Sequence, residues 1–280
     1  MPVGGLQHWI EEQRTRPPAP TRAWYWTLAF GIATLLFGLY LGQVFPQTGH
    51  DIAPGYGRPV LAFEFAGRQS DLEAIFGFYT DPQQVKRLAA MRIGNERDYL
   101  YMLLYAAFLT GGCLALWREL RLRALLAAAV LPIAAALCDA WENYLLFDIQ
   151  AAFTLGDYSP AMANLPYPVA AKFLLLAATN VMIGAAATRL GRWWALFGTV
   201  AILAAIPTAM AIITPAAFAW ALIPSTAGGW LLLLALATVG TWQAAARKSP
   251  LVDFGDAAPP APAIPEPAPP ARSVFGRRRT

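Results

Sequence analysis

The chain has 280 residues, of which 57% are hydrophobic and 14% are charged, and its formal net charge is +4. Soluble domains carry about 25% charged residues, so this composition excludes a soluble globular protein. Together with long apolar runs, it predicts an all-α, polytopic membrane helical bundle. We interpret the small positive charge as an orientation signal, and no binding of nucleic acid is expected.

An α-helix needs about 20 predominantly apolar residues to cross a bilayer, and six segments of the chain meet this requirement. They cover approximately residues 24–44, 98–117, 123–147, 168–188, 193–214 and 227–245. The start of the chain lacks an early apolar stretch with a small-residue cleavage site. We therefore expect the first segment to be a retained span and not a secretory signal.

The distribution of lysine and arginine predicts how the bundle is oriented. Basic residues gather before the first span and after the second, fourth and sixth spans, whereas loops 148–167 and 215–226 contain none. Because cytoplasmic loops carry the excess of basic residues, both termini are predicted to be cytoplasmic. The domains are then a cytoplasmic N-tail (1–23), a transmembrane domain (24–248) and a disordered Pro/Ala-rich cytoplasmic tail (249–280).

The long loop 45–97, on the outer side, is expected to form two or three short helices that lie on the membrane surface or cap the bundle. Ser70 and Glu73 have the spacing of a capping box, and Asp81 followed by Pro82 predicts another helix start. A loop of this length with its own helices is often functional, and a purely structural cap is the alternative.

Irregular helices are expected at three places. Gly38 and Gly42 have the spacing that permits close helix contact, although ordinary packing is the simpler interpretation. Pro132 should kink the third span. The stretch 214–229, which prolines and glycines interrupt, is expected to be an outer connection with part of a broken helix.

Charged residues from three spans are expected at similar depth. From the rise per residue of a helix, Asp139 lies about 22 Å and Glu142 about 27 Å from the cytoplasmic start of their span. Asp98 is at the outer end of the second span, and Lys172 is about 6 Å into the fourth span from the same side. These four side chains should therefore meet in the outer third of the bilayer.

Polar neighbours on the same helix faces extend this cluster, and Glu64 in the outer loop is placed to reach it. The candidate ligand-binding residues are Glu64, Asp98, Tyr101, Tyr105, Asp139, Glu142, Asn143 and Lys172. Asp139 and Glu142 are spaced three residues apart on one helix and would repel each other if both were ionised. Either one of them stays protonated or a cation lies between them. Ionisable groups within a membrane are usually functional, but polar contacts also hold helices together. The pattern therefore fits either a ligand pocket or a polar staple, by which we mean a set of polar contacts that only holds the spans together.

The two histidines, His8 and His50, lie outside the predicted spans. Their positions exclude a bis-histidine haem in the bundle, the multi-histidine iron sites of membrane oxidases and a histidine-based zinc protease. We expect no cofactor and no metal site.

Three stretches resemble a broad group of uncharacterised bacterial multi-pass membrane proteins. They are LAFEFAGRQSDLEAIFGFY, RDYLYMLLYAAFL and CDAWENYLLF, and together they span about residues 60–150. The resemblance implies the fold type and an acidic site, without an activity, at Glu64, Asp98, Asp139, Glu142 and Asn143. A weaker likeness to sterol-isomerase-type membrane proteins rests on the acids and Trp141, and the histidine expected there is missing.

We therefore predict a bacterial inner-membrane protein in contact with the lipid bilayer, with three candidate functions. In the first, the acidic pocket binds or passes a small cationic or amphipathic ligand, such as a lipid, or a cation. In the second, Asp139 or Glu142 is the acid–base group of a membrane-embedded enzyme with a lipid-like substrate. In the third, the cluster is a polar staple in a structural or assembly subunit. The oligomeric state does not follow from the sequence.

Overall fold

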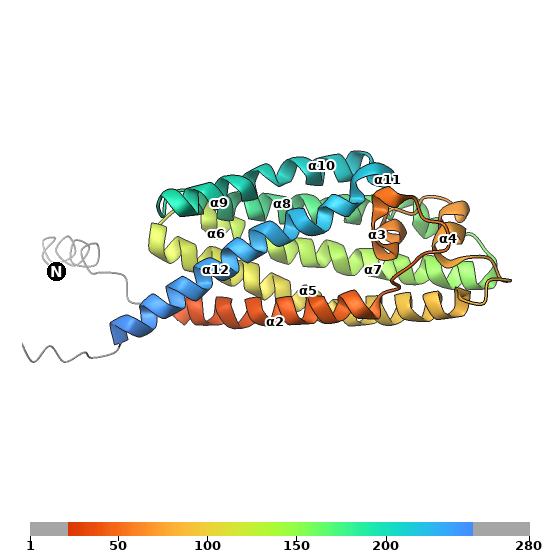
Figure 1. Cartoon of the computed structure of the whole chain (residues 1–280), viewed down its shortest axis with the longest axis horizontal. Coiled ribbons are helices and arrows are strands. Elements are labelled where there is room, and N and C mark those ends of the chain that lie inside the picture. The colour runs from red at the N-terminus through yellow and green to blue at the C-terminus, as the bar shows by residue number, and fades with distance from the viewer. Residues whose placement is uncertain (1–21, 249–280) are drawn as a thin grey trace, which may run out of the picture.

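Six helical segments long and apolar enough to cross a membrane make up the bundle, which confirms a multi-pass, all-α membrane protein (Figure 1). The computed structural model describes residues 22–248, and within them there is no β-strand. Most of the predicted N-tail and the whole of the predicted tail 249–280 lie outside the described residues. The spans are α2 (Arg22–Val44), α5 (Gln84–Leu120), α6 with α7 (Ala124–Ala128, Leu131–Leu155), α8 (Pro166–Ala187), α9 with α10 (Arg192–Leu203, Ala205–Ile213) and α12 (Leu222–Lys248).

The outside of the bundle is apolar, as a lipid-facing surface requires. Leu36, Leu103 and Leu137 are 61%, 68% and 68% exposed, respectively. In water such side chains would favour burial, whereas among lipid chains their exposure costs nothing. Figure 1 shows the start of α2 and the end of α12 at the same end of the bundle, as an even number of spans requires.

The short helices of loop 45–97 lie at the opposite end of the bundle (Figure 1). They are η1 (Pro54–Tyr56), α3 (Pro59–Glu64) and α4 (Gln69–Phe76), and we call residues 50–76 the cap. The predicted capping box at Ser70 is wrong, because α4 starts earlier. Asp71 Oδ2 instead accepts hydrogen bonds from the backbone N–H groups of Gly67 and Arg68, at 2.9 and 3.0 Å. A carboxylate in the first turn satisfies these free donors and favours the helix start.

The cap has its own apolar core, which fixes α3 on the bundle. Phe63 and Phe76 are fully buried, and their rings meet edge to face at 5.2 Å. They belong to a buried cluster that includes Met91 of α5 and Ile149 of α7. Because α3 packs into this cluster, its last residue, Glu64, is positioned against the bundle.

The helix of the second span begins at Gln84, well before the predicted start near residue 98. The segment expected to form a separate surface helix continues directly into the span, because no proline interrupts it. The N-terminal part carries exposed charged residues such as Lys86 and Arg92, which keep it out of the hydrocarbon. Asp81 closes the preceding turn by accepting a hydrogen bond from the N–H of Gln83 at 2.8 Å.

Prolines interrupt three of the other spans. The break between α6 and α7 precedes Pro132, as predicted, and the break between α9 and α10 precedes Pro207. Proline lacks an N–H group and its ring clashes with the carbonyl one turn earlier. The stretch 214–229 is also broken, with α11 (Pro215–Phe218) and η3 (Ala219–Ala221) before α12.

Candidate functional site

Lys172 of α8 lies at the centre of a buried carboxylate network. Its Nζ is 2.7 Å from Glu142 Oε2, 3.2 Å from Asp139 Oδ1 and 3.4 Å from Glu64 Oε2. The side chain of Glu142 is 1% exposed, and that of Glu64 is 12% exposed. The network therefore joins α7 and α8 within the bundle to α3 of the cap.

Helix α5 contributes the second part of the network. Asn143 Nδ2 donates hydrogen bonds to Asp98 Oδ2 at 3.0 Å and to the carbonyl of Asn95 at 3.3 Å. Tyr105 donates its hydroxyl hydrogen to Asp139 Oδ2 at 2.9 Å. Hydrogen bonds to charged groups are stronger than those between neutral groups, so these contacts order the acids as well as linking the helices.

The structure brings the candidate residues of the sequence together, although not all in the same role. Tyr101 contributes its ring, whose centroid is 5.7 Å from that of Tyr105 and 6.1 Å from that of Trp230. Sequence reasoning did not select Trp230 or Asn95. Asn95 lies three residues before Asp98 on the same helix face, which was a usable signal. Trp230 gave none, since only the packing of α12 brings it here.

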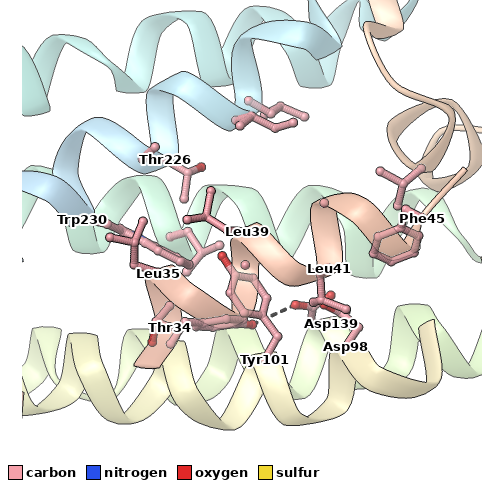
Figure 2. Close-up of a pocket in the computed structure, with 18 of the residues that line it drawn as sticks. Thr34, Leu35, Leu39, Leu41, Phe45, Asp98, Tyr101, Asp139, Thr226 and Trp230 are labelled. Atoms are coloured by element: carbon pink, nitrogen blue, oxygen red, sulfur yellow. Dashed lines mark hydrogen bonds between the residues drawn. The ribbon is translucent and has the colours of Figure 1, made fainter. Parts of the chain in front are cut away.

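A cavity of about 480 Å³ lies beside the network, within the range of ligand pockets, about 300–1,000 Å³. Figure 2 shows Leu35 and Trp230 toward one end of it and Asp98 with Asp139 toward the other, which is its polar end. The other network residues that line the cavity are Glu64, Tyr101, Tyr105, Asn143 and Lys172. Glu142 is not among the lining residues and lies behind Lys172.

Two hydrogen-bond donors at the cavity have no partner among the described residues. Asn95 is 1% exposed, and its Nδ2 has no hydrogen-bond acceptor; the same holds for the buried Nε1 of Trp230. An unsatisfied buried donor costs about 1–3 kcal/mol. An acceptor oxygen on a ligand would satisfy either donor that it reaches.

Comparison with known proteins identifies no relative of this chain. The chain matches no protein-family model, no curated protein and no solved structure. The resemblance over residues 60–150 therefore stays a prediction.

The network contains more acids than bases, because Glu64, Asp139 and Glu142 pair with the single Lys172 and Asp98 is bonded to the uncharged Asn143. Burial raises the pKa of Glu64 above its usual value; the charge of Lys172 opposes this effect and that of Asp139 adds to it. Within the described residues, no group of three or more His, Cys, Asp or Glu side chains is arranged to hold a metal ion. The excess of acid is balanced by protons or by a bound positive group.

Replacing Glu64 with glutamine should make stability less dependent on pH. In the folded protein the pKa of Glu64 is raised, so the folded state favours the protonated carboxyl. The stability that this preference contributes is complete below the unfolded pKa of 4.5 and is lost as pH rises through the folded pKa. Between about pH 4.5 and neutral pH, the thermal midpoint of the wild type should fall more than that of Glu64→Gln in the same detergent.

The matched control is Glu96→Gln, since Glu96 is half-exposed and pairs with Arg92 at 3.1 Å on the helix surface. This variant should keep the pH dependence of the wild type. Parallel pH profiles for Glu64→Gln and the wild type would contradict a raised pKa at Glu64.

Proposed function

We propose that the protein binds the positively charged head of a small amphipathic molecule in the acidic cavity. The observation that carries this proposal is the imbalance of charge in the buried network, where three acids pair with the single Lys172 and a fourth, Asp98, bonds to Asn143. The three acids are Glu64, Asp139 and Glu142. A buried carboxylate without a counter-charge is costly. A bound cation would supply that counter-charge within the bilayer.

The walls of the cavity support an amphipathic ligand over a simple ion. Beyond the acids, they consist mainly of apolar side chains from α2 and α12, such as Leu35, Leu39 and Leu231. Tyr105 bonds to Asp139, and the rings of Tyr101 and Trp230 pack against Tyr105. All three rings line the cavity, and aromatic faces attract ammonium groups. An organic ammonium with a short apolar part complements both regions.

The orientation predicted from the basic residues completes the proposal. With both termini in the cytoplasm of a bacterial cell, the cap would lie on the outer side of the inner membrane. The cavity would then open in the outer leaflet.

An acid–base enzyme is the second candidate function. The geometry favours only Asp139 as its acid–base group, because Glu142 does not line the cavity.

Ligand-dependent thermal stability of the full-length protein in a neutral detergent tests the proposal. Octylammonium should raise the thermal midpoint and octanol should not, because only the first carries a positive charge. Asp98→Asn keeps the side-chain shape and an acceptor for Asn143, and it should weaken octylammonium binding about tenfold to a hundredfold, as expected for a lost charged contact of about 1.5–3 kcal/mol.

The matched control is Asp148→Asn on α7, where Asp148 accepts a hydrogen bond from Ser159 and lies outside the cavity lining. It should bind octylammonium like the wild type. Equal stabilisation by octanol and octylammonium would contradict the proposal. If Asp98→Asn lowers stability while the octylammonium response stays unchanged, the network is a polar staple instead.

A further inference from the structure

We infer that the ligand is a long-chain amine, whose hydrocarbon chain lies between α2 and α12 and which reaches the acids from within the bilayer. This inference rests on the proposed function and narrows it to amines that partition into membranes. It also assigns the route of entry to the side of the bundle, from the lipid.

Helices α2 and α12 are close at one end and separate toward the cap. An added Cβ at Gly240 of α12 would lie 2.7 Å from the ring of Trp24 of α2. At Gly31 of α2 it would lie 2.7 Å from the ring of Phe108 of α5 and 2.8 Å from Leu234 Cδ1 of α12, so the helices pack closely there. At Gly42, closer to the cap, an added Cβ would meet nothing within 4 Å. Figure 1 shows α12 crossing obliquely, consistent with this divergence.

The space between the diverging helices continues from the cavity to the lipid-facing surface. Leu35 and Leu39 of α2 are 42% and 62% exposed, and Ile223 and Leu231 of α12 are 48% and 54% exposed. All four also line the cavity, and we call them the side opening. Because both helices are membrane spans, the exposed parts of these side chains face lipid chains, and an alkyl chain can lie between them.

The cap closes the same cavity toward the end of the bundle. Val60 and Leu61 of α3 line it there, and Leu61 is 4% exposed. Arg58 lines it too, and its Nη1 donates a hydrogen bond to the carbonyl of Gly42 at 3.3 Å. This contact ties the cap to the end of α2, so the side opening is the apolar route to the acids.

Charge decides which membrane molecule fits this route. Glu64, Asp98 and Asp139 line the cavity together with Lys172, and the exposed Arg58 lines it at the cap, so acids outnumber cations there. Like charges brought together at a binding site are strongly unfavourable. Lipids with phosphate or carboxylate heads are therefore disfavoured, whereas an amine is attracted. The unpartnered Nδ2 of Asn95 adds a preference for an oxygen atom near the amine.

Two probes and two variants test the position of the chain in the full-length protein in neutral detergent. Dodecylammonium and butylammonium have the same head and differ in chain length. Leu39→Trp fills the side opening, whereas Leu36→Trp changes a residue of α2 that is 61% exposed and is not part of the cavity lining. Each probe has the same concentration in the micelles for both variants. A difference between the variants therefore does not come from the partitioning of the probe into detergent.

We expect Leu39→Trp to lose more than half of the rise in thermal midpoint that dodecylammonium causes, while the response to butylammonium is kept. Leu36→Trp should keep both responses, and dodecanoate should stabilise none of the proteins. A full dodecylammonium response in Leu39→Trp would overturn the inference, and the proposed function would still stand if octylammonium stabilises the wild type. Equal stabilisation by dodecanoate would overturn the assignment of an amine. If no amine stabilises the wild type, the proposed function fails as well.

Discussion

Replacing Lys172 with methionine should lower the free energy of unfolding by about 3–5 kcal/mol, the typical cost of breaking a buried ion pair from one side. Methionine keeps an unbranched apolar side chain but removes the ammonium that lies 2.7 Å from Glu142 and 3.2 Å from Asp139. The acids then have no counter-charge in a site from which water is largely excluded. Thermal and denaturant unfolding in one detergent would measure the loss.

A second substitution separates charge from packing at Lys172. Adding Glu142→Gln to Lys172→Met should recover part of the lost stability, because the most deeply buried acid is then neutral. Lys86→Met is the control; Lys86 is exposed on α5, and a change within about 0.5 kcal/mol is expected there. Wild-type stability of Lys172→Met would show that the network does not depend on this charge.

Replacing Gly184 with alanine should destabilise the bundle by about 1–3 kcal/mol, as overpacking typically does. An added Cβ on Gly184 of α8 would lie 2.6 Å from the backbone oxygen of Gly198 of α9. A backbone atom cannot move aside as a side chain can, so the two helices must separate. Because α8 also carries Lys172, this shift should disturb the network, and unfolding in detergent would detect the loss.

Gly42→Ala is the matched comparison, since it makes the same chemical change near the end of another span. Nothing lies within 4 Å of an added Cβ at Gly42, and alanine favours the helix by up to about 1 kcal/mol over glycine. We therefore expect this variant to be as stable as the wild type or slightly more stable. Similar losses in both variants would rule out the close contact between α8 and α9 as the cause.

The two glycine sites also show where a sequence pattern is insufficient. Gly38 and Gly42 have the spacing of a helix-contact motif, yet Gly42 faces open space and Gly38 faces the ring of Tyr101. The close backbone contact instead joins Gly184 and Gly198, which have no such pattern. Ordinary packing at Gly38 was the simpler interpretation, and the spacing alone did not identify the partner helix.

The number of candidate spans, and the convergence of the acids with Lys172, could be predicted from the sequence alone. Apolar length decides which segments can cross the hydrocarbon, and a constant rise per residue places Asp98, Asp139 and Lys172 along one common axis. The start of α5 could not be placed as well, because residues 84–97 are compatible with either a separate helix or a longer span.

Only the tertiary structure decided which atoms meet and where space is left. The rotation of each helix and its crossing angle arise from side-chain packing across interfaces, which residue spacing within one helix does not specify. Lys172 thus pairs most closely with Glu142, while Asp98 pairs with Asn143. In the same way, α2 and α12 approach closely at Gly240 and Trp24, and the cavity lies farther along the two helices, beside the acids.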